Sequence, residues 1–170
     1  MCALWRSEKG MKFIVKIMFV CTGNICRSAM AHWMMKDKLQ KNNINDVEVC
    51  SSGIYAQNGD TPTYNAIETM EEFNIDIKKH RATNTMNSDI TNMDLIFGMT
   101  KSHKDELIYL YPNLKEKIFT LKEYVNYEKD GHDSINIKDP WGFDISTYRA
   151  CGAEIDECLD LLINKIKEQV

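Results

Sequence analysis

The strongest constraint on the fold of this chain is an apolar run that leads directly into a loop of small and polar residues. Phe13–Val20 (FIVKIMFV) is rich in β-branched and aromatic side chains and has the length of a buried strand. The loop Cys21–Ser28 (CTGNICRS) follows at once, and Ala29–Lys41 then carries apolar residues at helical spacing. A buried strand, a short loop and a helix in this order predict the first unit of an α/β fold.

Strands and helices alternate along the rest of the chain. Because such alternation is typical of parallel sheets, we expect a four-stranded parallel sheet flanked by helices on both faces. A Ser-x-x-Asp pattern predicts a helix that begins near Ser102, and residues 126–146 are expected to form a polar loop. The further expected strands are Val47–Ser51, Asp94–Met99 and Lys117–Leu121, and the further expected helices are Asn65–Phe73 and a segment from Thr147 onward.

Length and charge narrow the class of protein. The 170 residues are about one domain's worth, so we expect a single domain over residues 11–170, preceded by an N-terminal extension over residues 1–10, with Met11 as an alternative start. A net charge of −4 argues against a nucleic-acid partner. The first apolar run is too short to span a bilayer and contains Lys16, so we expect no membrane partner. We expect a cytoplasmic protein whose six cysteines stay reduced.

The loop after the first strand has the chemistry of a phosphate site. A loop that opens a helix presents unpaired backbone N–H groups and positive dipole potential. Gly23 and Asn24 permit the unusual backbone angles that an anion-binding turn needs, and Arg27 offers a planar fork for two oxygens. The same positive field favours the thiolate of Cys21, to which Ser28 can donate a hydrogen bond. These residues predict that Cys21 attacks phosphorus as a nucleophile.

Such a reaction also needs an acid that protonates the leaving oxygen. Asp139 is the best candidate because it lies in the long polar loop, where Pro140 stiffens the backbone after it. The alternative is a solvated turn aspartate, which is common in Asp-Pro pairs. No Walker loop is present, and Cys21 and Cys26 are too far apart for a C-x-x-C redox motif. The histidines show no zinc-ligand spacing with the cysteines, so we expect neither a metal nor a cofactor.

The run V-C-T-G-N-I-C-R-S, with an Asp-Pro pair far downstream, resembles the low-molecular-weight protein tyrosine phosphatases. The resemblance covers nearly everything from Met11 to the C-terminus. It implies that Cys21 becomes phosphorylated, that Arg27 binds the phosphoryl group, and that Asp139 acts first as acid and then as base. The remaining residues of the implied phosphate-binding loop, between the first strand and the first helix, are Thr22, Gly23, Asn24, Ile25, Cys26 and Ser28.

The resemblance implies roles for residues outside this loop. Ser51 and His80 would support the loop, and Trp141 and Tyr55 would form the walls of the substrate pocket. Cys26 would form a reversible disulfide with the nucleophile and so shield it from irreversible oxidation.

The chain also departs from the family pattern. Ala29 stands where the family usually has proline, His32 replaces a common glutamate, and Gly142 follows the aromatic residue where a second aromatic is frequent.

The substrate is the main open question. The segments DLIFGMTKSHK and IFTLKEYV resemble the bacterial protein arginine phosphatase branch of the family, whose loop typically has threonine where this chain has Ile25. Isoleucine favours an apolar aromatic ring, so the sequence predicts hydrolysis of phosphotyrosine in proteins, with phosphoarginine as the alternative. Arsenate reduction would need redox cysteines within residues 95–112, which contain none, and a promiscuous small-molecule acid phosphatase remains an alternative.

A phosphoprotein-binding module without activity would lack one of the three reactive residues, and all of them are present. We expect phosphorylated proteins as partners, and a monomer or a weak dimer.

Overall fold

The computed structural model describes residues 14–128 and 135–169. Four parallel strands form one sheet in the order β2-β1-β3-β4, which confirms the predicted sheet. The expected extension over residues 1–10 lies outside the described residues. The strands are β1 (Val15–Cys21), β2 (Val47–Gly53), β3 (Leu95–Gly98) and β4 (Ile118–Thr120).

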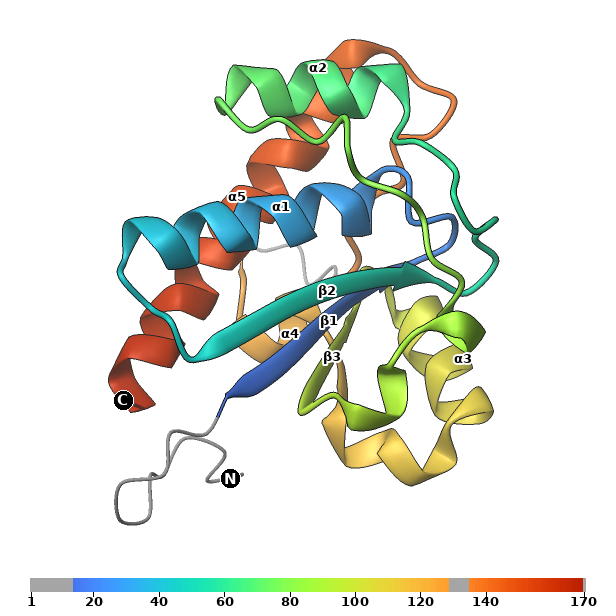
Figure 1. The fold of residues 1–170 in the computed structure, drawn as a ribbon, viewed down its shortest axis with the longest axis vertical. Helices are drawn as coiled ribbons and strands as arrows, with labels where there is room; N and C mark the ends of the chain where they lie inside the picture. Colours follow the sequence, from blue (N-terminus) through green and yellow to red (C-terminus); the bar gives the residue numbers. More distant parts are fainter. Residues whose placement is uncertain (1–13, 129–134, 170) are drawn as a thin grey trace.

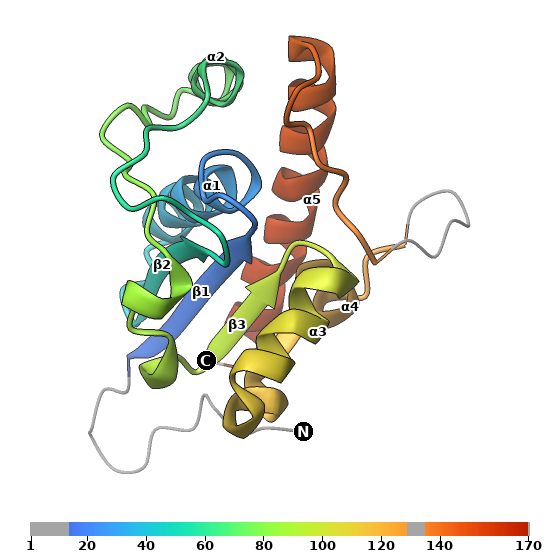
Figure 2. The same cartoon turned by 90° about the vertical axis from the view of Figure 1, so that its right-hand side faces the viewer.

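Helices cover both faces of the sheet, with α1 and α5 on one face and α3 on the other (Figure 1, Figure 2). Helix α2 packs against α5 beyond the end of the sheet at which β1 and β3 finish. In the described part of the chain, the helices are α1 (Arg27–Lys41), α2 (Tyr64–Glu72), α3 (Lys101–Leu110), α4 (Leu121–Val125) and α5 (Ile145–Gln169), with 3-10 helices at Thr85–Asn87, Ile90–Asn92 and Pro112–Lys117.

Strand β1 is the centre of the core because both of its faces are covered. Ile17 and Phe19 belong to the cluster that α1 and α5 complete, whereas Met18 and Val20 pack in a second cluster with Leu107 of α3. Successive side chains of a strand point to opposite faces, so one apolar run serves both clusters. This explains why the run is continuously apolar instead of alternating with polar residues.

Helix α5 presents its apolar face to α1, as the spacing of its apolar residues predicts. Ile155, Leu159, Leu162 and Ile166 are all buried, and α1 and α5 are packed against each other. The helix begins at Ile145, two residues before the expected start, because the carboxylate of Asp144 accepts a hydrogen bond from the backbone N–H of Thr147 at 3.1 Å.

Most expected boundaries differ from the observed ones by one or two residues, and in two cases a threonine that caps a helix explains the difference. Helix α3 begins at Lys101 because the Thr100 hydroxyl accepts the backbone N–H of His103, which makes Thr100 the N-cap that was expected at Ser102. The strand expected to continue to Leu121 stops at Thr120, whose hydroxyl accepts the backbone N–H of Glu123 and starts α4. A threonine such as Thr120 can be the last residue of a strand and also the N-cap of the helix that follows.

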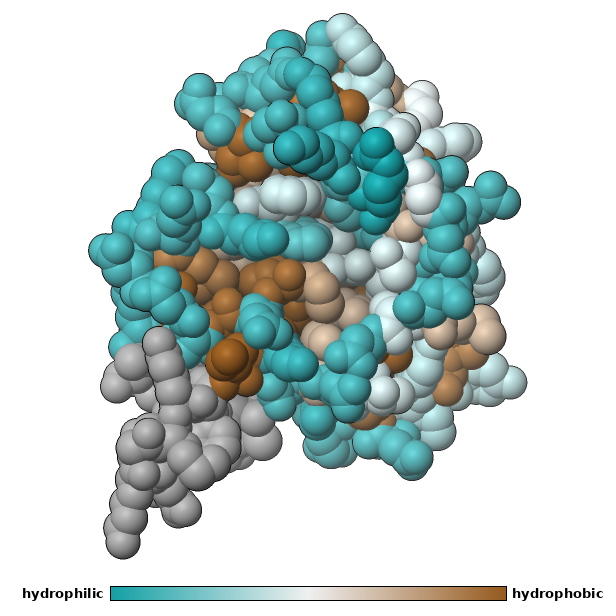
Figure 3. All heavy atoms as spheres, viewed as in Figure 1, coloured by the Kyte–Doolittle hydropathy of each residue, from teal (hydrophilic) through white to brown (hydrophobic). Residues whose placement is uncertain are grey.

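The surface shows where the sheet is least covered. Strand β2 lies at the sheet edge, and hydrophobic side chains gather along it in the space-filling view, where Val47 and Val49 are half-buried (Figure 3). The loop that follows β1 lies beyond the carboxyl ends of β1 and β3. This is the end of the sheet at which α/β folds bind ligands. Within residues 14–128 and 135–169, no helix has the length and apolar character that a membrane span requires.

Candidate active site

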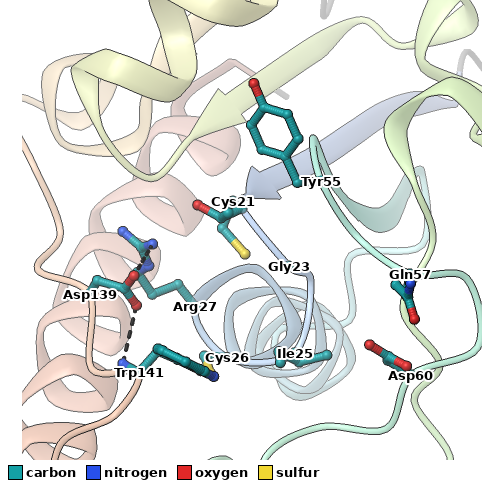
Figure 4. A pocket seen from close by; sticks show the side chains of 11 residues that line it. Cys21, Gly23, Ile25, Cys26, Arg27, Tyr55, Gln57, Asp60, Asp139 and Trp141 are labelled. Carbon is teal, nitrogen blue, oxygen red and sulfur yellow. Dashed lines mark hydrogen bonds and ion pairs between the residues drawn. The ribbon is translucent and has the colours of Figure 1, made fainter.

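A pocket of about 360 Å³ lies over the loop that joins β1 to α1. The sulfur of Cys21 points into it, with Arg27 and Asp139 together on one side (Figure 4). Trp141 and Tyr55 lie on opposite sides of that sulfur. The structure thus brings together residues 21–27 of the loop with three predicted residues from distant segments. The lining residues are Cys21, Thr22, Gly23, Ile25, Cys26, Arg27, Tyr55, Gln57, Asp60, Asp139 and Trp141.

Polar groups surround the sulfur of Cys21 at hydrogen-bond distance. The Ser28 hydroxyl oxygen lies 2.9 Å from Sγ, and the backbone N–H of Asn24 donates to Sγ at 3.3 Å. Ser28 lies in the first turn of α1, where the helix dipole adds positive potential. The sulfur at the floor of the pocket therefore lies among hydrogen-bond donors and beside the start of a helix.

Asn24 gives the loop its shape. It has a left-handed backbone with φ of 56° and is fully buried, a conformation that asparagine tolerates better than most residues. Its side-chain amide donates to the hydroxyls of Ser28 at 2.8 Å and Ser51 at 2.9 Å, and its Oδ1 accepts the backbone N–H of Thr83 at 3.0 Å. Gly23 was expected to share this role, but its φ is not positive, so Asn24 alone makes the left-handed turn of this loop.

His80 holds the backbone of Asn24 from the other side. Its Nδ1 accepts the indole N–H of Trp33 at 3.2 Å, so the ring hydrogen must lie on Nε2. Nε2 then donates to the carbonyl oxygen of Asn24 at 2.8 Å. Burial lowers the pKa of His80, which is consistent with a neutral ring that donates one hydrogen bond.

Arg27 and Asp139 form an ion pair on one side of the pocket. The guanidinium Nη2 lies 3.1 Å from Oδ2 of Asp139, and Nη1 donates to the carbonyl oxygen of Ile137 at 3.1 Å. The Ile137 backbone N–H donates to the carbonyl oxygen of Met99 at 2.8 Å, which fixes the loop of Asp139 to the end of β3. Nε of Arg27 is buried and has no hydrogen-bond partner among the described residues, so one donor of the guanidinium is unsatisfied in this structure.

The aromatic residues form an open rim. Trp141 and Tyr55 are both largely exposed, and the Tyr55 hydroxyl donates to the carboxylate of Glu106 on α3. The backbone N–H of Trp141 donates to Oδ1 of Asp139 at 3.2 Å. This hydrogen bond holds the Asp139 carboxylate next to the backbone of the aromatic residue. Ile25 lies at the lower edge of the pocket, on the same side of the sulfur as Trp141 and opposite Tyr55 (Figure 4).

Gly53 is a supporting residue that the sequence reasoning missed. It pairs with Cys21 in the register of β1 and β2, and a Cβ there would lie 2.6 Å from the carbonyl oxygen of Thr22 and 2.8 Å from the backbone nitrogen of Asn24. No side chain fits beneath the loop at this position. A glycine within a strand can mark a close backbone approach, but the strand expected from the sequence ended at Ser51, two residues before Gly53.

Gln57 and Asp60 also line the pocket, at the edge far from Arg27 (Figure 4). They lie in a polar turn of ordinary composition, which carries no sequence signal of a site. No group of three side chains suited to hold a metal ion is found in the described part of the chain.

His32 extends the network behind the loop. The Ser51 hydroxyl accepts from Asn24, so its own hydrogen is free to donate to Nδ1 of His32 at 3.0 Å. The hydrogen of His32 then lies on Nε2, which is buried without a partner among the described residues. Burial, with smaller contributions from the neighbouring His80 and Lys36, lowers the pKa of His32 to about 3.

This lowered pKa predicts an acid-sensitive contribution to stability. In the unfolded chain His32 takes up a proton near its ordinary pKa of about 6.5, whereas in the folded chain it stays neutral down to about pH 3. The unfolded state therefore binds more protons in this window, and stability falls as the pH falls through it. We expect wild type to lose roughly 2 kcal/mol more than His32→Gln between pH 7 and pH 5. Urea denaturation at both pH values measures this difference, and equal losses would contradict the assignment.

Comparisons with known proteins agree with the geometry of the pocket. Residues 16–170 match the family model described as low molecular weight phosphotyrosine protein phosphatase. A protein-arginine-phosphatase of Geobacillus stearothermophilus is 34% identical over 154 residues, which are 91% of this chain and 97% of the relative.

Two solved structures share the fold at similar identity. A low molecular weight protein tyrosine phosphatase from T. tengcongensis superposes with a TM-score of 0.80 at 36% identity, covering 89% of this chain and 99% of that one. A mutant of the YwlE arginine phosphatase with a phosphorylated active-site serine superposes with a TM-score of 0.82 at 32% identity, covering 90% of this chain and 96% of that one. The resemblance seen in the sequence is confirmed, and the chain belongs to the low molecular weight phosphotyrosine protein phosphatase family.

Proposed function

We propose that this protein hydrolyses phosphotyrosine in proteins through a cysteinyl-phosphate on Cys21. The observation that carries the proposal is the floor of the pocket, where the Cys21 sulfur receives the Asn24 backbone N–H and lies 2.9 Å from the Ser28 hydroxyl. Ser28 Oγ accepts from the Asn24 amide, and its one hydrogen can donate to the carbonyl oxygen of Ser52 at 3.3 Å or to the nearer sulfur of Cys21 when that sulfur carries the negative charge. A thiolate below an anion-binding loop is placed to attack a bound phosphoryl group.

In the first step, the sulfur forms a bond to phosphorus while the bond from phosphorus to the tyrosine oxygen breaks. Arg27 holds the phosphoryl oxygens, and its unpartnered Nε supplies one of the donors. The bound phosphoryl group replaces Asp139 as the partner of the guanidinium, and the released carboxylate takes up a proton from solvent, which it gives to the leaving phenolate oxygen as the bond to phosphorus breaks. Arg27, which neutralises the phosphoryl charge, and Asp139, which transfers the proton, therefore act from the same side of the pocket.

In the second step, water attacks phosphorus, the carboxylate of Asp139 takes a proton from that water, and the bond between sulfur and phosphorus breaks. Inorganic phosphate leaves and the thiolate is restored. The phosphorylated serine of the related arginine phosphatase mutant supports a covalent route of this kind. The backbone links from Asp139 to Trp141 and from Ile137 to Met99 keep the acid in reach during both steps.

The pocket favours an aromatic leaving group. Trp141 and Tyr55 stand on either side of the sulfur, and Ile25 adds an apolar surface at the edge on the side of Trp141. A flat phenyl ring can fill the space between these side chains, whereas a guanidinium placed against Ile25 would lose hydrogen bonds to water. Phosphoarginine is the second candidate substrate, because a relative named protein-arginine-phosphatase shares 34% of its residues with this chain.

The two substrates are separated by comparing phosphotyrosine and phosphoarginine peptides of otherwise identical sequence. We expect wild type to prefer phosphotyrosine and Ile25→Thr to shift the ratio of kcat/KM values toward phosphoarginine by about tenfold. Ile14→Thr, an exposed position away from the pocket, is the matched control and should leave the ratio unchanged. Asp139→Ala should lower kcat for the peptide by at least about 100-fold.

A wild-type preference for phosphoarginine would overturn the choice of substrate. Full activity in Cys21→Ser would overturn the mechanism for both substrates.

We further propose that Cys26 protects the nucleophile against oxidation. It lines the same pocket as a free thiol, 3.2 Å from the Tyr148 hydroxyl, and burial raises its pKa. Peroxide converts the Cys21 thiolate to a sulfenic acid, and condensation with the neutral Cys26 thiol forms a disulfide and releases water. A thiol reductant then restores both cysteines.

After brief treatment with peroxide, wild type should recover its activity on addition of dithiothreitol. Cys26→Ala should lose activity irreversibly, because its sulfenic acid can be oxidised further. Cys50→Ala, a cysteine on β2 outside the pocket, is the control and should behave as wild type. Equal recovery in all three proteins would exclude the protective role of Cys26.

A further inference from the structure

A buried histidine connects α3 to the phosphate loop and has no part in the mechanism above. His103 is buried, and both of its ring nitrogens have hydrogen-bond partners. Nδ1 lies 2.9 Å from the Thr100 hydroxyl oxygen, and Nε2 lies 2.9 Å from the Thr22 hydroxyl oxygen. Thr22 directly follows the reactive cysteine, so this chain of contacts runs from the N-cap of α3 into the pocket.

The contacts of Thr100 fit a His103 ring whose hydrogen lies on Nε2. As the N-cap, the Thr100 hydroxyl oxygen accepts the backbone N–H of His103 at 3.2 Å. Its own hydrogen can donate to Nδ1, and we assign the ring hydrogen to Nε2 in this arrangement. Burial and the charge of Arg27 lower the pKa of His103 to about 4, so the ring is neutral at ordinary assay pH. Nε2 therefore donates to the Thr22 hydroxyl oxygen.

The hydrogen bond from His103 leaves the hydroxyl hydrogen of Thr22 for another acceptor. Its oxygen accepts from His103, so its hydroxyl hydrogen must point to a different partner. The backbone carbonyl of Thr22 accepts the N–H of Tyr55 at 2.9 Å, which fixes the residue at the pocket edge. Thr22 is exposed and lines the pocket, so a ligand bound there is the nearest new acceptor.

We propose that the Thr22 hydroxyl donates a hydrogen bond to the oxyanion bound in the pocket, and that His103 is the positioning residue that orients this hydroxyl. The proposal rests on the proposed phosphatase function and adds one side-chain donor to the backbone donors and Arg27. A hydrogen bond to a charged oxygen is worth more than one between neutral groups, so its loss should be measurable.

Two substitutions at Thr22 separate the hydroxyl from the shape of the side chain. Thr22→Val keeps the shape and removes the donor, so kcat/KM for a phosphotyrosine peptide should fall about tenfold and inhibition by inorganic phosphate should weaken by a similar factor. Thr22→Ser keeps the hydroxyl and should recover most of both values. Thr91→Val, at an exposed threonine outside the pocket, should match wild type.

The role of His103 is tested by substitutions that remove or keep its N–H donor, and by a double variant that also carries Thr22→Val. His103→Leu should reproduce the Thr22→Val defect, and the double variant should be little worse than either single one, because one hydrogen bond is lost in each case. His103→Gln, which retains an N–H donor, should recover part of the loss.

The proposal would be overturned if Thr22→Val kept the kcat/KM and the phosphate inhibition of wild type. Additive defects in the double variant would overturn it as well. So would equal defects in His103→Gln and His103→Leu. A merely structural role would lower thermal stability without weakening phosphate inhibition. Failure of this proposal leaves the activity of wild type and its loss in Cys21→Ser intact, so it is distinct from failure of the proposed function.

Discussion

The buried left-handed turn at Asn24 is the constraint on which the rest of the site depends. A non-glycine residue in this conformation is strained by roughly 1–2 kcal/mol and persists only where its surroundings hold it. Here the side-chain amide bonds Ser28 and Ser51, and the carbonyl oxygen accepts from His80. The turn directs the Asn24 N–H at the sulfur of Cys21 and brings the loop into α1. Without these hydrogen bonds the backbone would relax and the anion-binding shape would be lost.

Charge in the site is concentrated near the reacting atoms. Arg27 is buried, and in the structure its charge is balanced by Asp139. The histidines that surround the loop are kept neutral by burial, which lowers the pKa of His80 and lowers that of His103 to about 4. They act as hydrogen-bond partners and do not compete with Arg27 for the phosphoryl group. The positive potential of the pocket thus comes from one guanidinium, the loop N–H groups and the start of α1.

The fold and the loop were predictable because their signals are local. The apolar run that became β1, the face of α5 around Ile155, and the loop composition each lie within a short window of sequence. Ser51 and His80 came from the family resemblance, since contacts to Asn24 across 27 and 56 positions leave no pattern in a single sequence. The Thr100 cap was missed because Ser102 offered a competing signal two residues later.

The central claim is that the sulfur of Cys21 carries the phosphoryl group during turnover. The most direct measurement is mass spectrometry of enzyme quenched in acid within milliseconds of mixing with a phosphotyrosine peptide, followed by proteolysis to locate the added group. Asp139→Ala accumulates the adduct if the substitution slows the attack of water more than the attack of the cysteine. The account predicts one phosphoryl group on Cys21 in wild type or in this variant. Turnover with no phosphorylated Cys21 in either protein, or a phosphoryl group on another residue, would contradict it.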